Sequence, residues 1–165
     1  MRRPALQLDN SEPDSSDHGV ISLITSRPTQ FIDITDRIRA LVEASGVSLG
    51  IVNIQALHTT TAILLNENEP LLLADFEAAL GRIVPADGRY RHDDPSLRVV
   101  NLTPNERTNG HSHCRALLLG TSACVNIVDG TLVLGRWQRL FFVELDGPRE
   151  RCISAVVLGN PGSRR

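Results

Sequence analysis

The stretch Ala-Cys-Val-Asn-Ile-Val-Asp-Gly-Thr-Leu-Val-Leu, residues 123–134, decides the fold class of this chain. Two strand-like runs, Ala123 to Val128 and Thr131 to Leu134, flank the dipeptide Asp129-Gly130. Asp-Gly tolerates the positive φ angles of a tight two-residue turn, so the pattern predicts a β-hairpin with antiparallel strands.

Further strands are predicted on both sides of this hairpin. They are short runs of mainly apolar residues, most of them bounded by turn residues. They comprise Val20 to about Ser26, Gly50 to Leu57, Thr61 to Leu65, Leu140 to Leu145 and Cys152 to Leu158.

Two helices are predicted in the first half of the chain. Apolar residues at helical spacing from Ile34 to Val42, with Gly46 as a stop, indicate the first. The second opens at Asn68-Glu69-Pro70, with Asn68 as cap and Pro70 at the first helical position. It is apolar around much of its circumference, so we expect it to be well buried. Strands dominate, which makes the fold class α+β with mainly antiparallel pairing.

The 165 residues suit one folded domain. Residues 1–18 are polar and contain a Ser/Asp cluster, so we interpret them as a flexible N-terminal tail. Residues 19–165 then form the single domain.

All seventeen basic residues are arginine, because the chain contains no lysine. This excludes a Walker A loop, a Schiff base on lysine and a lysine general base. Any phosphate site must therefore use arginine, backbone N–H groups, histidine or a metal ion.

Charge and hydropathy argue against nucleic acid or a membrane as a partner. The net charge is −2 and no long basic run is present. No apolar run approaches the roughly 18 residues of a membrane helix. The three cysteines have no metal-type spacing, and we interpret them as buried free thiols of a reducing, cytoplasmic setting.

Four histidines lie in polar or turn contexts: His58, His92, His111 and His113. Histidines from separate elements are how catalytic zinc sites are usually built, with three ligands and one open position. On an extended backbone, His111 and His113 would point to one side. Surface or hydrogen-bonded histidines are the alternative, and spacing alone does not decide between the two.

Other polar residues could assist such a site. Glu67 and Asp75 flank the start of the second helix and could act as a general base or orient a histidine. Arg115 offers a guanidinium fork for phosphate, with a solvated surface arginine as the alternative. Gln138 could bind a pyrimidine edge or a phosphate. We interpret Trp137 as a core or interface anchor.

Four motifs in this order resemble the YjbQ-like family, to which secondary thiamine-phosphate synthase activity is attributed. They are His58 to Asn68 followed by Asp75, Tyr90 to Asp93, Ser112 to Ser122, and Gly130 to Gln138. The resemblance covers roughly residues 20–160. The family often has lysine at the position of Arg115, and His111 is less regular in it than His113.

The resemblance implies an α+β fold with a β-sandwich, assembled as a homotrimer. It implies a metal ion on His58, His92 and His113, with zinc expected and magnesium as the alternative. Thr59, Thr60, Asn66, Arg115 and Gln138 would bind the substrate, and Glu67, Asp75 and Arg115 would act in catalysis.

The implied reaction joins hydroxymethylpyrimidine diphosphate to a thiazole phosphate and releases pyrophosphate. Two alternatives remain open at this point. One is a zinc-dependent hydrolase of a small phosphorylated or acyl metabolite, and the other is a trimeric protein that binds a metal or metabolite without turnover.

Overall fold

The computed structural model describes residues 15–161. Within this range the chain forms a mixed series of strands and helices, of which η1 is a single 3-10 turn. In chain order these are β1 (Ser15–Ile24), β2 (Gln30–Asp33), α1 (Thr35–Ser45), β3 (Val47–Ala56), β4 (Thr61–Glu67), α2 (Pro70–Ile83), η1 (Arg91–Asp93), α3 (Gly110–Leu119), β5 (Ser122–Val128), β6 (Thr131–Leu132), β7 (Gln138–Glu144) and β8 (Glu150–Pro161).

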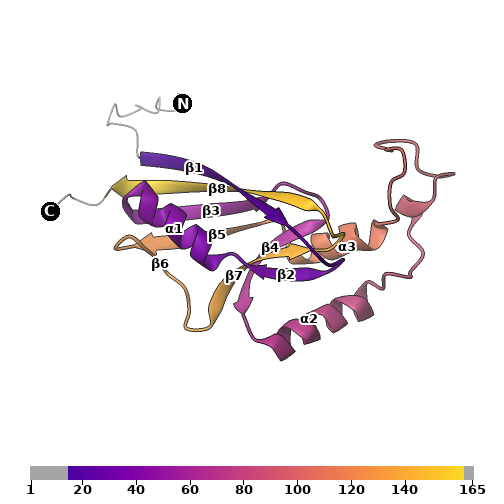
Figure 1. Cartoon of the computed structure of the whole chain (residues 1–165), viewed down its shortest axis with the longest axis horizontal. Coiled ribbons are helices and arrows are strands. Elements are labelled where there is room, and N and C mark those ends of the chain that lie inside the picture. Colours follow the sequence, from indigo (N-terminus) through magenta and orange to yellow (C-terminus); the bar gives the residue numbers. More distant parts are fainter. Residues whose placement is uncertain (1–14, 162–165) are drawn as a thin grey trace, which may run out of the picture.

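The strands form two antiparallel sheets, as Figure 1 shows. The larger sheet has the order β1-β8-β3-β5-β6, and the smaller has the order β2-β7-β4. The α+β class with a mainly antiparallel sandwich is therefore confirmed. The predicted hairpin is also confirmed, since Asp129 and Gly130 have φ angles of 51° and 73° between β5 and β6.

Alternate residues of the smaller sheet divide the core into two layers. Ile63, Leu140 and Phe142 face the larger sheet and α1, where they join the main hydrophobic cluster. Ala62, Phe141 and Val143 point the other way, toward α2 and α3. Because side chains alternate across a strand, one small sheet serves both layers.

The first predicted helix is confirmed, and Gly46 ends α1 in the left-handed conformation at φ 69°. The second begins at Pro70 as expected, but its cap is Glu69. The Glu69 carboxylate accepts hydrogen bonds from the Leu71 and Leu72 N–H groups at 2.9 and 2.8 Å. The expectation that α2 is well buried was wrong: Leu80 is its one buried residue, and Leu71 is 76% exposed.

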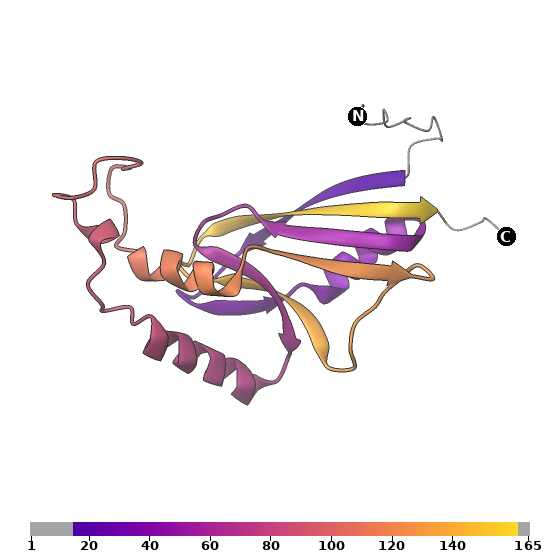
Figure 2. The ribbon, with the colours of Figure 1, turned by 180° about the vertical axis from the view of Figure 1, so that it is seen from behind.

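The helix α3 was not predicted from the sequence. It follows a long connection after α2, and Figure 2 shows both helices at the same end of the molecule. Since residues two apart on a helix point in nearly opposite directions, the expectation that His111 and His113 point to one side was wrong.

Other expectations need smaller corrections. β1 begins at Ser15, so the boundary of the N-terminal tail at residue 18 was placed too late; residues 1–14 lie outside the described range. The cysteines are free, but Cys114 and Cys124 are exposed rather than buried.

Trp137 is 61% exposed and is no core residue. In the described part of the chain, no helix combines the length and apolar character that crossing a membrane requires.

Candidate functional site

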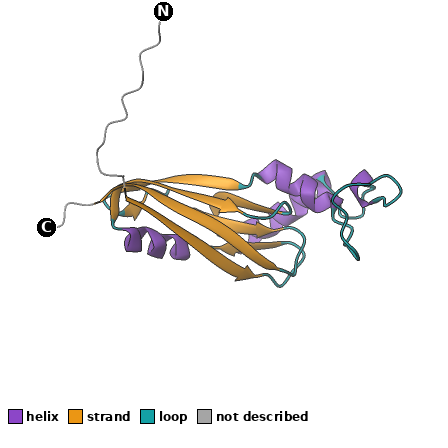
Figure 3. Ribbon diagram, turned by 90° about the horizontal axis from the view of Figure 1, so that it is seen from above, coloured by secondary structure: helices purple, strands orange, loops and turns teal. Residues whose placement is uncertain are grey.

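A polar cavity of about 480 Å³ is lined by residues of α3 and of the neighbouring loops. Figure 3 shows helices and loops gathered at one end of the strands. Three connections form the cavity: the β3–β4 turn, the β7–β8 loop and the long segment between α2 and α3. Its lining residues are Leu57, His58, Thr59, Thr60, His92, Arg98, Asn101, Glu106, Asn109, His113, Asp146, Arg149 and Arg151. The three histidines that the family resemblance implied as metal ligands thus line one cavity, together with Thr59 and Thr60.

His92 and His113 form a close pair within this cavity. Their ring centroids lie 4.6 Å apart in edge-to-face contact. His92 Nε2 is buried and has no hydrogen-bond partner within residues 15–161. Burial lowers the pKa of His113, and the neighbouring His92 ring lowers it further. An imidazole that resists protonation keeps a lone pair, which metal binding requires.

His58 sits differently from the other two. Its Nε2 accepts a hydrogen bond of 2.9 Å from the Cys152 N–H group of β8. Burial lowers the pKa of His58, and the positive charge of Arg151 adds to that shift. The lone pair of Nε2 is therefore already used within the protein.

The implied three-imidazole metal centre does not fit this arrangement. Among the described residues, no group of three or more His, Cys, Asp or Glu side chains is placed to hold a metal ion. His92 and His113 could still supply two ligands of such a centre, because their rings are in contact and His92 Nε2 has no partner among the described residues. His58 does not join them, since its Nε2 accepts the hydrogen bond from the Cys152 N–H group.

Arginines of the β7–β8 region supply the positive charge of the cavity. Arg151 is 4% exposed and forms a bidentate pair with the fully buried Glu144, at 2.7 Å for both contacts. Its Nη2 also donates to Thr60 Oγ1 at 3.1 Å. Burial raises the pKa of Glu144, but the hydrogen bonds and charge of Arg151, together with hydrogen bonds from the Asp146 N–H group and the Thr25 hydroxyl, more than offset this, and the net shift is downward.

Arg149 is the more accessible of these two cations. Its Nη2 pairs with Asp146 at 2.8 Å, and its Nε donates to the Asp146 carbonyl. Asp146 also accepts from the Asn109 side-chain amide at 3.0 Å, and Asn109 Oδ1 is buried with no partner in the described part of the chain. The sequence alone did not single out these residues, because their strand ends meet α3 only in the folded chain.

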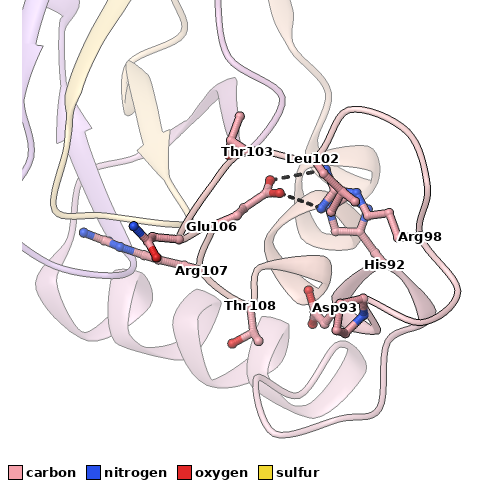
Figure 4. Close-up of a pocket in the computed structure, with 10 residues that line it drawn as sticks. His92, Asp93, Arg98, Leu102, Thr103, Glu106, Arg107 and Thr108 are labelled. Atoms are coloured by element: carbon pink, nitrogen blue, oxygen red, sulfur yellow. Dashed lines mark hydrogen bonds and ion pairs between the residues drawn. The ribbon is translucent and has the colours of Figure 1, made fainter.

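A second cavity of about 440 Å³ lies beside the first and shares His92, Arg98 and Glu106 with it. Figure 4 shows Arg98 and Glu106 joined by two contacts, with His92 next to them. The ion pair measures 2.9 Å, and Arg98 also donates to the carbonyls of Val100 and Asn101. The pair therefore pins the loop between η1 and α3 at the border of the two cavities.

Arg115, expected to bind phosphate, does not line the histidine cavity. It is buried at 6% exposure, and its Nε donates to the Val84 carbonyl at 2.9 Å. Its Nη1 lies 3.4 Å from Thr29 Oγ1. The side chain points to the far side of α3 from His113, where it ties α3 to the end of α2.

Four other predicted site residues also lie away from the cavity of their own chain. Thr61 begins β4 near the cavity, whereas Asn66 and Glu67 end it, roughly 20 Å away at about 3.3 Å per residue. Gln138 pairs in register with Glu67, and its Oε1 accepts from the Gly135 N–H group. Asp75 is exposed on α2. The sequence motif is continuous, but the extended strand separates its two ends.

His111 faces away from the pair as well. Its Nε2 lies 3.1 Å from Ser112 Oγ, and its ring lies near Tyr90. Burial lowers its pKa, with Arg115 adding to the shift. Leaving His111 out of the ligand set is consistent with this placement.

Comparisons of the sequence and of the fold with known proteins point to the same family. A 44% identical relative, a UPF0047 protein of Methanothermobacter thermautotrophicus, matches 86% of this chain and 91% of its own length. A YbjQ-like protein of Sulfolobus solfataricus P2 has a TM-score of 0.78 and 34% identity, covering 88% of this chain and 98% of that structure. A structure of the YjbQ/UPF0047 family from Clostridium acetobutylicum has a TM-score of 0.75 and 36% identity, covering 84% of this chain and 98% of its own.

The family described as UPF0047 protein YjbQ-like matches residues 19–160, which include every element that lines the histidine cavity. The chain therefore belongs to the YjbQ-like UPF0047 family.

Proposed function

We propose that this chain is a metal-dependent enzyme that handles phosphorylated small molecules in the histidine cavity. The observation that carries the proposal is one juxtaposition. The buried Nε2 of His92 has no hydrogen-bond partner among the described residues, and its ring packs against His113 in the cavity that Arg149 and Arg151 also line.

The arginines support an anionic ligand. Three arginines line the cavity, and each is paired with one carboxylate: Arg98 with Glu106, Arg149 with Asp146, and Arg151 with the buried Glu144. Arg149 and Arg151 each hold a carboxylate through Nη2, and neither has a protein partner at Nη1 among the described residues. Guanidinium N–H groups match phosphate oxygens in geometry and charge. In a chain without lysine, they are the cations available for this task.

The imidazole pair supports a metal ion. Two imidazoles suit zinc better than magnesium, which prefers oxygen ligands. With two protein ligands, oxygens of the bound molecule or water would complete the coordination. A metal ion held there would supply positive charge next to the phosphate.

The reaction implied by the family resemblance is that of secondary thiamine-phosphate synthase. In it, pyrophosphate leaves the pyrimidine's methylene carbon while the thiazole nitrogen attacks. Negative charge grows on the leaving group, so Arg149 and Arg151 would stabilise it and hold it in line. Thr59 and the Asn109–Asp146 pair would orient the polar edge of a substrate.

We also propose that the chain assembles as a homotrimer. Large apolar side chains on α2 and α3 are exposed, with Leu71 at 76%, Ile83 at 67% and Leu117 at 84%. Large exposed apolar surfaces mark interaction sites, and contacts between subunits would cover these side chains.

The experiment is an assay of the zinc-loaded protein with hydroxymethylpyrimidine diphosphate and thiazole phosphate, followed by detection of thiamine phosphate and pyrophosphate. We expect product formation in wild type and its loss in Arg149→Gln, with Arg139→Gln as the control outside the cavity. Release of phosphate without coupling would favour a hydrolase. Tight pyrophosphate binding without turnover would favour a binding protein. Absence of both binding and turnover would refute the proposal.

A further inference from the structure

His58 completes a hydrogen-bond ladder at the point where β3 ends. The Leu57 N–H group donates to the Cys152 carbonyl at 3.2 Å, and the Cys152 N–H group donates back to His58 Nε2 at 2.9 Å. The imidazole thus takes the place that a backbone carbonyl would occupy in continued β3–β8 pairing. Turning the ring away would leave the Cys152 N–H group without this acceptor.

This hydrogen-bond pattern determines which ring nitrogen of His58 carries the proton. A nitrogen that accepts a hydrogen bond carries a lone pair, so a neutral His58 must have its proton on Nδ1. In this tautomer neither nitrogen has a lone pair left for a metal ion. His58 lines the cavity, and Nδ1 has no partner among the described residues.

We infer that His58 is a neutral hydrogen-bond donor to the bound ligand through Nδ1–H, and that it is not a metal ligand. The acceptor is a phosphate oxygen, a point that rests on the proposed function. Thr59 and Thr60 follow His58 in the same turn, and Thr60 contacts Arg151. The Nδ1–H group and the guanidiniums of Arg149 and Arg151 then belong to one phosphate-binding subsite, next to the His92–His113 pair.

The turn that presents the ring is itself fixed. Thr61 Oγ1 donates to the His58 carbonyl at 3.1 Å, and the Leu145 N–H group donates to the Thr60 carbonyl at 3.2 Å. The ring is therefore anchored at its backbone and at Nε2, which leaves Nδ1–H in a set direction. A fixed donor needs no reorganisation when an anion binds.

The tautomer can be read directly by long-range ¹H–¹⁵N correlation on protein labelled with ¹⁵N-histidine, before and after zinc is added. We expect His58 to show a protonated Nδ1 and a bare Nε2 in both spectra, while the His92 and His113 signals change with zinc. A bare Nδ1, or His58 nitrogens that shift as zinc-bound ones do, would overturn the inference.

Two variants separate the donor role of Nδ1 from the acceptor role of Nε2. His58→Asn keeps a side-chain donor near the position of Nδ1, whereas His58→Gln keeps a side-chain acceptor near that of Nε2. We expect both variants to bind zinc with wild-type stoichiometry. The pyrophosphate Kd should rise by about tenfold or more in His58→Gln, as expected for loss of a hydrogen bond to a charged group, and clearly less in His58→Asn.

His18→Asn, which replaces an exposed histidine on β1, is the matched control and should leave both measurements unchanged. Zinc loss in both His58 variants would overturn the inference, as would equal pyrophosphate affinity in His58→Gln and wild type. If wild type bound no pyrophosphate while the spectra showed the expected tautomer, the proposed function and the phosphate acceptor would fail. The exclusion of His58 as a metal ligand would stand.

Discussion

His92 and His113 bring their rings to a centroid distance of 4.6 Å from opposite ends of a long connection. His92 lies on η1 and His113 on α3, and Asp93 ties these elements together by accepting from the Asn109 and Gly110 N–H groups, both at 2.9 Å. The carboxylate caps the start of α3 and so places His113 against its partner.

This pair leads to a prediction about metal binding. His113→Ala should lower zinc affinity by at least about tenfold, since even residues that only orient a ligand cost 10–100-fold when replaced. His111→Ala, on the same helix but facing Tyr90, should bind zinc as wild type does. Competition with a chromophoric chelator measures both. Equal zinc affinity of His113→Ala and wild type would contradict the metal site.

The sequence predicts the sheets better than the site. Strand periodicity and Asp129-Gly130 are local signals, so the hairpin and the antiparallel class could be read from them. The helix α3 was missed, because its first turn contains Gly110 and three polar residues and resembles a loop.

The family resemblance could predict which histidines share the cavity, but it could not predict their tautomers or their hydrogen bonds. The tautomer of His58 depends on Cys152, which is 94 residues further along the chain. Glu67 was assigned to the site because its motif is continuous with His58. Because a β-strand is extended, residues far apart along it are also far apart in space, and β4 therefore separates Glu67 from His58.

The buried Glu144–Arg151 pair should be a strong determinant of stability. Glu144→Gln would leave Arg151 buried with a neutral partner, and breaking such a pair typically costs about 3–5 kcal/mol. Asp36→Asn removes a carboxylate that is 77% exposed and should change stability by less than about 1 kcal/mol. Urea denaturation of both variants gives the free energies of unfolding. Similar values for the two would contradict the assignment.

Stability should also fall as the pH is lowered through the range of histidine titration. Burial lowers the pKa of His58, His111 and His113 in the folded chain. The unfolded chain, with pKa values near about 6.5, then binds more protons in this range, so the free energy of unfolding rises with pH. The contribution is complete above about pH 7.5 and is lost as the pH falls below about 6.5.

Denaturation at a series of pH values between about 5 and 8 measures this slope while most carboxylates stay ionised. His111→Gln removes one contributor outside the proposed ligand set and should flatten the curve. A free energy of unfolding that rises as the pH falls through this range would contradict the lowered pKa values.

The Arg98–Glu106 pair should control the loop at the border of the two cavities. Glu106→Gln removes the 2.9 Å ion pair, and the side chains involved are only 13% and 23% exposed. We expect faster hydrogen exchange in residues 94–109 and little change in the sheets. Asp94→Asn is a control in the same loop, where the carboxylate accepts hydrogen bonds from Ser96 nearby and takes no part in the Arg98–Glu106 pair. Unchanged exchange in Glu106→Gln would show that other contacts hold the loop.

The contrast between Arg115 and Arg149 separates a structural arginine from a ligand-binding one. Arg115→Met removes the donor to the Val84 carbonyl that joins α3 to the end of α2. Losing a buried hydrogen-bond partner costs about 1–3 kcal/mol, so the free energy of unfolding should fall by that amount. Pyrophosphate affinity should stay near the wild-type value, because the side chain does not line the cavity.

Arg149→Gln should give the opposite result. Its side chain is 36% exposed, so stability should change little, while pyrophosphate affinity should fall by about tenfold or more, since a charge-assisted hydrogen bond is lost. Urea denaturation and calorimetric titration of both variants complete the comparison. A loss of affinity in Arg115→Met with full stability would move the phosphate site to α3. If neither variant lost pyrophosphate affinity, neither arginine would be a ligand-binding residue.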